Sequence, residues 1–126
     1  MPPKLRVGLV GYGKAGSAVA NVLSGDSRFD IRWIARRSTT EVQFHSPTEI
    51  PIVGIDQYPY IKLLEDQPID ALVDFSLPAS LYAYGSEVAR RGITLVSAIS
   101  AYSEQDIAYA RELGLYTRVL CSPNIT

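Results

Sequence analysis

Three closely spaced glycines are the residues of this sequence whose types and spacing best suit chemistry. Gly11, Gly13 and Gly16 lie within LVGYGKAGSAV, residues 9–19. Where a strand turns into a helix, free backbone N–H groups and the helix dipole attract a phosphate, and glycine keeps side chains out of its way. The same glycines also suit a plain strand-to-helix turn. Their place between a strand pattern and an amphipathic helix pattern favours a dinucleotide pyrophosphate.

A pair of arginines follows the next predicted strand, where the adenosine ribose of a dinucleotide is usually recognised. An NAD site usually has Asp or Glu there to bind the ribose 2′-hydroxyl. Guanidinium groups instead bind phosphate through paired donors, so arginines favour the 2′-phosphate of NADP, with NAD as the alternative cofactor. A solvated basic loop is the other interpretation. No acidic residue lies between Asp30 and Glu41, and the segment reads Ala35, Arg36, Arg37, Ser38, Thr39, Thr40.

A third candidate segment, Phe75-Ser76-Leu77-Pro78, ends the fourth predicted strand. In open α/β sheets, ligands bind beyond the carboxyl ends of the strands. A flat aromatic ring and a hydroxyl at that place suit the nicotinamide end of a cofactor. A simple strand end with Ser76 as a helix cap explains the segment equally well.

These segments need a scaffold, and the hydrophobic pattern predicts one. Short apolar stretches alternate with stretches whose apolar residues recur at helical spacing. Gly25 is expected to end the first helix through a positive φ, and Ser103 with Asp106 has the spacing of a capping box. Strands are predicted at residues 5–10, 29–35, 52–55, 71–75, 93–97 and 115–120, with a loop over residues 37–51. The alternation predicts a Rossmann-type, doubly wound α/β fold with a parallel sheet of about six strands in a single domain.

Composition excludes several other classes of function. The chain has 126 residues, enough for one domain, and its net charge of −1 gives no overall attraction to nucleic acid or a membrane surface. The single cysteine, Cys121, excludes an internal disulfide and a cysteine-rich zinc site, and no metal is expected. The one histidine, His45, is expected on the surface. The sequence has no apolar run of ~20 residues and no signal-peptide pattern, so a cytoplasmic protein is expected.

Four segments in order resemble a known family. VGLVGYGKAG, DALVDFSLPAS, GITLVSAISAYSEQDI and VLCSPNIT are similar to the N-terminal domain of dihydrodipicolinate reductase (4-hydroxy-tetrahydrodipicolinate reductase), of lysine and diaminopimelate biosynthesis. DFSLP and SPNIT are the most specific pieces, and residues 38–68 are the least similar. The resemblance implies transfer of a hydride from NADH or NADPH to a cyclic imine-type dicarboxylate.

The resemblance also assigns residues to the cofactor. It places the three glycines at the dinucleotide, Arg36 at the adenosine phosphate, the DFSLP segment near nicotinamide, and Ser122, Pro123 and Asn124 at a domain crossover. Together with the glycine loop and the arginine pair, it gives the predicted cofactor-binding residues: Gly11, Tyr12, Gly13, Lys14, Ala15, Gly16, Arg36, Arg37, Ser38, Phe75, Ser76, Pro78, Ala98, Ser100 and Asn124.

Two departures from the family bear on the reaction. The family's G-T-T-G stretch beside nicotinamide and substrate is replaced here by Ala98, Ile99, Ser100 and Ala101. The family's substrate domain, with a His-rich motif and a lysine, follows the P-N segment, whereas this sequence stops at Thr126. We therefore expect residues 1–126 to be a cofactor domain without the C-terminal substrate domain, inactive alone, with no catalytic residue, and able to form a homo-oligomer.

Two other functions remain open on the sequence alone. One is a stand-alone module that binds or senses NADP. The other is the cofactor domain of an amino-acid dehydrogenase such as diaminopimelate dehydrogenase, whose opening resembles RVGLVGYG. DFSLP and SPNIT favour the reductase over the dehydrogenase.

Overall fold

Strands and helices alternate along the chain as the sequence predicts. The computed structural model describes residues 3–11, 13–37, 50–99 and 101–121. Its elements are β1 (Leu5–Val10), α1 (Lys14–Ser24), β2 (Phe29–Arg36), β3 (Ile52–Gly54), α2 (Tyr60–Asp66), β4 (Ala71–Asp74), α3 (Ala79–Arg90), β5 (Thr94–Ser97), α4 (Glu104–Leu113) and β6 (Val119–Cys121).

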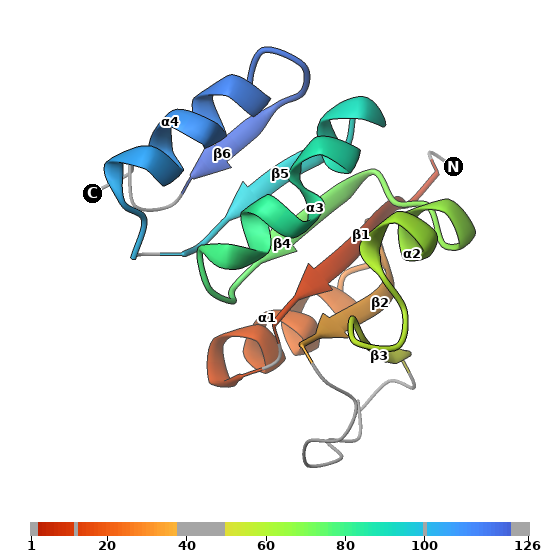
Figure 1. Cartoon of the computed structure of the whole chain (residues 1–126). Coiled ribbons are helices and arrows are strands. Elements are labelled where there is room, and N and C mark those ends of the chain that lie inside the picture. The colour runs from red at the N-terminus through yellow and green to blue at the C-terminus, as the bar shows by residue number, and fades with distance from the viewer. Residues whose placement is uncertain (1–2, 12, 38–49, 100, 122–126) are drawn as a thin grey trace.

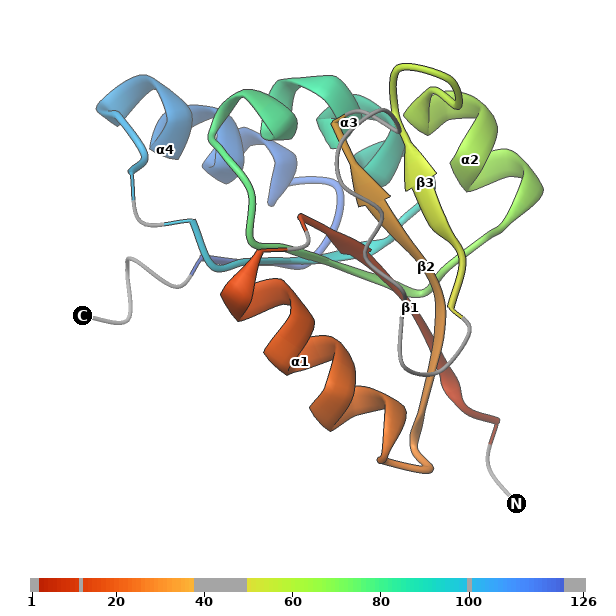
Figure 2. The same ribbon diagram turned by 90° about the horizontal axis from the view of Figure 1, so that it is seen from below.

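The six strands form one parallel sheet in the order β3-β2-β1-β4-β5-β6 (Figure 1). Helix α1 covers one face, and α2, α3 and α4 cover the other (Figure 2). A parallel sheet needs both faces covered, which explains why its central strands are almost continuously apolar. The predicted Rossmann-type, doubly wound fold is therefore confirmed.

A buried cluster lies on each side of the sheet. Trp33, Leu72, Leu81 and Tyr84 belong to the larger cluster, beneath α2, α3 and α4. Val7, Leu9, Ala20, Ile31 and Ile34 form the smaller one, beneath α1.

Trp33 shows how the sequence prepares the larger cluster. A Cβ added at Gly8 on the neighbouring strand would lie 2.6 Å from the Trp33 ring, so only glycine leaves room for the indole. The indole N–H then donates a 3.0 Å hydrogen bond to the carbonyl of Gln67, just beyond α2.

The last predicted strand is wrong over most of its length. The prediction covered residues 115–120, but β6 is Val119–Cys121. Backbone hydrogen bonds turn the chain back on the end of α4, from Leu115 to Glu112 and from Tyr116 to Leu113. Leu115 and Tyr116 are 79% and 71% exposed. Their apolar side chains, which predicted a strand, therefore do not belong to the sheet.

Two predicted helix-end residues lie where the sequence places them, in one case for the wrong reason. Ser103 and Asp106 form the expected capping box, with hydrogen bonds in both directions. Gly25 follows α1 as expected, but its φ is −84°, so the helix does not end through a left-handed residue. Within the described residues, no helix has the length and apolarity that a membrane crossing needs.

Candidate functional site

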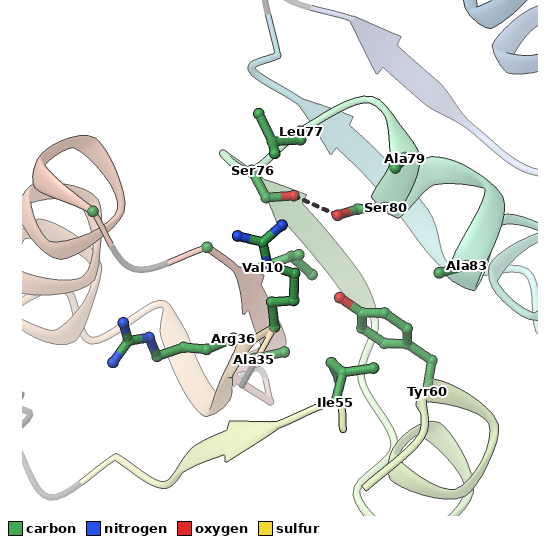
Figure 3. Close-up of a pocket in the computed structure, with 13 residues that line it drawn as sticks. Val10, Ala35, Arg36, Ile55, Tyr60, Ser76, Leu77, Ala79, Ser80 and Ala83 are labelled. Atoms are coloured by element: carbon green, nitrogen blue, oxygen red, sulfur yellow. Dashed lines mark hydrogen bonds between the residues drawn. The ribbon is translucent and has the colours of Figure 1, made fainter. Parts of the chain in front are cut away.

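A cavity of about 540 Å³ opens at the carboxyl ends of the central strands. It lies between the ends of β1, β2 and β4, with the start of α3 on one side and the start of α2 on the other (Figure 3). This edge is where open α/β sheets bind ligands. Its lining residues are Val10, Gly11, Gly13, Ala35, Arg36, Arg37, Ile55, Tyr60, Ser76, Leu77, Ala79, Ser80 and Ala83.

Two of the three loop glycines are required by the fold itself. Gly11 has a φ of +94°, and a Cβ there would lie 3.1 Å from the backbone nitrogen of Ser76. A Cβ at Gly16 would lie 2.5 Å from the carbonyl oxygen of Gly11, closer than real Cβ atoms come. These glycines let β1, α1 and the segment after β4 approach one another closely.

Gly13 has no such internal reason. It precedes the first turn of α1, is exposed, and a Cβ built on it meets no described atom within 4 Å. Gly13 is the N-cap of α1 and has no side chain with which to cap the helix, so it does not itself occupy the N–H groups of the first turn. The space in front of Gly13 thus fits an anion held by backbone N–H groups.

The arginine pair reaches the same cavity from the end of β2. Arg36 is half-buried and Arg37 exposed, and both line the cavity. The end of β2 is held beside the residue that follows β3 by a 2.8 Å hydrogen bond from the Ile55 N–H to the Arg36 carbonyl. Ala35, where an NAD site would carry an acid, is completely buried. The two cationic side chains therefore lie at one end of the cavity, and the last buried position of β2 carries an alanine rather than an acid.

A buried carboxylate, which the sequence analysis missed, organises the end of β4. One oxygen of Asp74 accepts hydrogen bonds from the Ser76 backbone at 2.7 Å and the Ser76 hydroxyl at 2.6 Å, and the other accepts from Tyr84 at 2.5 Å. Burial raises the pKa of Asp74, although these hydrogen bonds oppose the rise. An acid at the end of an apolar strand, two residues before a serine, was the available signal.

Ser76 therefore does not cap α3. Its hydroxyl contacts Asp74 and lies 2.7 Å from the hydroxyl of Ser80, and the helix N-cap is Pro78, with no side-chain hydrogen bond (Figure 3). Of the two interpretations of this segment, the helix cap is wrong. Ser76 lines the cavity instead.

The structure brings only some of the predicted cofactor-binding residues to the cavity. Gly11, Gly13, Arg36, Arg37 and Ser76 line it, whereas Gly16, Phe75, Pro78 and Ala98 do not. Lys14 and Ala15 belong to the first turn of α1, but their side chains lie outside what the structure describes. The predicted residues that lie wholly outside the described part of the chain are Tyr12, Ser38, Ser100, Asn124 and His45.

Sequence reasoning missed the rest of the lining, above all Ile55, Tyr60, Ser80 and Ala83. Ile55 directly follows β3, Tyr60 belongs to α2, and Ser80 and Ala83 belong to α3; tertiary packing brings them to the glycine loop. The described part of the chain holds no group of three or more His, Cys, Asp or Glu that could bind a metal ion.

Tyr84→Phe should lower the free energy of unfolding by about 1–3 kcal/mol, because it removes a hydrogen bond from a buried carboxylate. Tyr82→Phe is the matched control, since Tyr82 donates an equally short 2.5 Å bond to Asp106 on the exposed surface. It should stay within about 0.5 kcal/mol of the wild type. Urea unfolding measures both.

The Tyr84→Phe loss should also depend on pH. The pKa of Asp74 is raised in the folded protein, so this carboxyl takes up its proton above its ordinary range. A protonated carboxyl gains less from a donated hydrogen bond, so the loss should be larger at neutral pH and shrink as the pH falls through that raised pKa. Equal losses for the two variants at neutral pH would contradict a special role for the buried network.

Comparison with protein families gives one match over nearly the whole chain. The family model described as "Dihydrodipicolinate reductase, N-terminus" matches residues 5–125. No curated protein matches the sequence significantly.

Solved structures share the fold at low identity. Homoserine dehydrogenase from S. aureus matches with a TM-score of 0.71 and 14% identity, covering 95% of this chain and 32% of its own. Myo-inositol 2-dehydrogenase from Lactobacillus plantarum has a TM-score of 0.76 at 10% identity, with 95% and 36% covered. Scyllo-inositol dehydrogenase from Lactobacillus casei, with bound NAD(H) and scyllo-inositol, has 0.74 at 13%, also with 95% and 36% covered. The chain thus spans about a third of the length of these proteins.

Proposed function

The chain belongs to the family of dihydrodipicolinate reductase N-terminal domains, and on that premise we propose that it binds a nicotinamide dinucleotide as the cofactor domain of a reductase. The observation that carries the proposal is Gly13. Its two neighbouring glycines are needed by the fold, but Gly13 faces open space at the N-terminus of α1. A pyrophosphate there would explain why no side chain stands at this position.

The preferred cofactor in this proposal is NADPH. Arg36 and Arg37 supply guanidinium donors at the end of β2, where a 2′-phosphate would lie. An acid at the position of Ala35 would instead favour the free 2′-hydroxyl of NAD. The buried alanine and the two cationic neighbours both support NADPH over NADH.

The proposed reaction is reduction of a cyclic imine-type dicarboxylate, as the family membership suggests. The bound cofactor would supply the hydride, and the chain's own residues would hold and orient it. Gly11, Gly13 and the first turn of α1 would hold the pyrophosphate, and the two arginines the 2′-phosphate. Ser76, tied to Asp74, would fix the chain at the end of β4.

The remaining half of the chemistry belongs, in this proposal, to a second domain. Described hydroxyls near the ends of β4 and β5 are bonded to one another: Ser76 to Ser80 at 2.7 Å and Ser97 to Tyr102 at 2.6 Å. In this proposal, the proton donor and the substrate-orienting groups belong to that second domain. The matched structures are about three times as long, which agrees with this division.

Gly13→Val should abolish NADPH binding and leave the fold intact. The valine side chain has room in the free protein, because a Cβ meets no described atom within 4 Å, but it would occupy the space of the pyrophosphate. Calorimetric titration measures binding, and thermal unfolding checks the fold. Gly25→Val, at the opposite end of α1, is the control, with its nearest Cβ contacts at an ordinary 3.7 Å. Normal binding by Gly13→Val would reduce the loop to a simple turn.

The double variant Arg36→Ala, Arg37→Ala should weaken NADPH binding by about 1.5–3 kcal/mol, the value of a charge-assisted phosphate contact. Its affinity for NADH should change little, because NADH lacks the 2′-phosphate. Titrating both cofactors against wild type and variant gives the difference. Equal wild-type affinities for NADPH and NADH would overturn the proposed preference.

The 126-residue chain alone should bind NADPH without reducing tetrahydrodipicolinate precursor at an enzymatic rate. Orientation of the reactants is worth roughly 7–11 kcal/mol at best, and one domain leaves the substrate side of the cofactor uncovered. The assay follows NADPH consumption with this chain and with any longer product that the gene encodes. Ordinary turnover by the shorter chain would contradict the proposed division, and a longer product that binds NADPH but stays inactive would point to another substrate.

A further inference from the structure

Tyr60 places a hydroxyl inside the cavity that no partner among the described residues uses. It is the first residue of α2, and its side chain is 6% exposed. The ring is held edge-on against Tyr84, with centroids 5.5 Å apart and an interplanar angle of 80°. Figure 3 shows the phenol oxygen pointing into the cavity between Arg36 and Ala83. The packing fixes the ring, so the hydroxyl has a defined position.

Three other tyrosines use their hydroxyls in hydrogen bonds within the protein. Tyr84 donates to Asp74, Tyr58 to Asp66, and Tyr102 shares a hydrogen bond with Ser97. Within the described part of the chain, the Tyr60 hydroxyl makes no hydrogen bond. Because the hydroxyl faces the cavity, a ligand atom in that cavity is the candidate partner.

The protonation state of Tyr60 makes it a donor. Burial, with the nearby charge of Asp74, raises the pKa of its phenol well above the ordinary range. The phenol therefore keeps its proton throughout the physiological range. It would offer this hydrogen to a lone pair of a ligand atom.

The surroundings of this hydroxyl fit a flat ring. Apolar side chains make up most of the wall, and the hydroxyls of Ser76 and Ser80 are already bonded, to each other and to Asp74. The cationic groups, Arg36 and Arg37, stand at the end of β2. The Tyr60 hydroxyl makes no hydrogen bond among the described residues and lies in an apolar slot beside the two arginines. Such a slot suits a heteroaromatic base with a ring acceptor, attached to a phosphorylated ribose. The apolar lining consists of Val10, Ala35, Ile55, Leu77, Ala79 and Ala83.

We propose that Tyr60 is a specificity residue that donates a hydrogen bond to a ring nitrogen of the purine base of the bound dinucleotide. The inference rests on the proposed function, because it assigns a base-recognition role within the same cavity. It assigns to α2 a contact with the base, which the glycine loop and the arginine pair do not provide.

The test is Tyr60→Phe, which keeps the ring and removes only the hydroxyl. Calorimetry with NADPH should show affinity about 3- to 10-fold weaker than wild type, as expected for one neutral hydrogen bond. Tyr58→Phe is the matched control, since Tyr58 bonds Asp66 on the surface and does not line the cavity. Its NADPH affinity should equal that of the wild type.

A base-free probe separates recognition of the base from general damage to the cavity. Binding of 1-deoxyribose 2,5-bisphosphate should be the same for wild type and Tyr60→Phe, whereas adenosine 2′,5′-bisphosphate should lose the same factor as NADPH. An unchanged NADPH affinity in Tyr60→Phe, or an equal loss for the base-free probe, would overturn the inference alone. A wild-type protein that binds no NADPH would overturn the proposed function together with it.

Discussion

The close backbone approach between Gly11, Gly16 and Ser76 is the constraint on which the site depends. The carbonyl of Gly11 lies where a Cβ of Gly16 would be, and the backbone of Ser76 closes on Gly11 from the other side. Three elements from different parts of the chain therefore meet within van der Waals contact, with no side chain between them. Dispersion contacts at this density hold only one arrangement. The start of α1 is consequently fixed against the end of β4.

Asp74 extends this constraint from backbone to side chains. Its carboxylate is completely buried, and burying it without hydrogen-bond partners would destabilise the folded protein. The fold therefore depends on the hydrogen bonds that Ser76 and Tyr84 donate to it. Tyr84 in turn packs against the ring of Tyr60. A chain of contacts thus runs from the glycine loop through β4 and α3 to α2. The two walls of the cavity, one near α1 and one at α2, are positioned by the same network.

The sequence predicts the fold well because the fold depends on local patterns. Periodicity identifies the alternating strands and helices, and the parallel order follows from that alternation. It fails at β6, where Leu115 and Tyr116 are apolar without being buried. The site is predicted only where it follows a motif. Tyr60 carries no local signal, because its value comes from the direction of its hydroxyl after α2 has packed on Tyr84.

The structure tests the glycine motif residue by residue. On sequence alone, a plain strand-to-helix turn is the alternative explanation for Gly11, Gly13 and Gly16. The geometry separates them, because Gly11 and Gly16 would clash with the protein's own backbone and Gly13 would clash with nothing described. Glycine also costs conformational entropy wherever it is kept. A position that bears this cost without an internal contact is best explained by something that approaches from outside, and the helix N-terminus behind it and the arginines beside it both favour an anion.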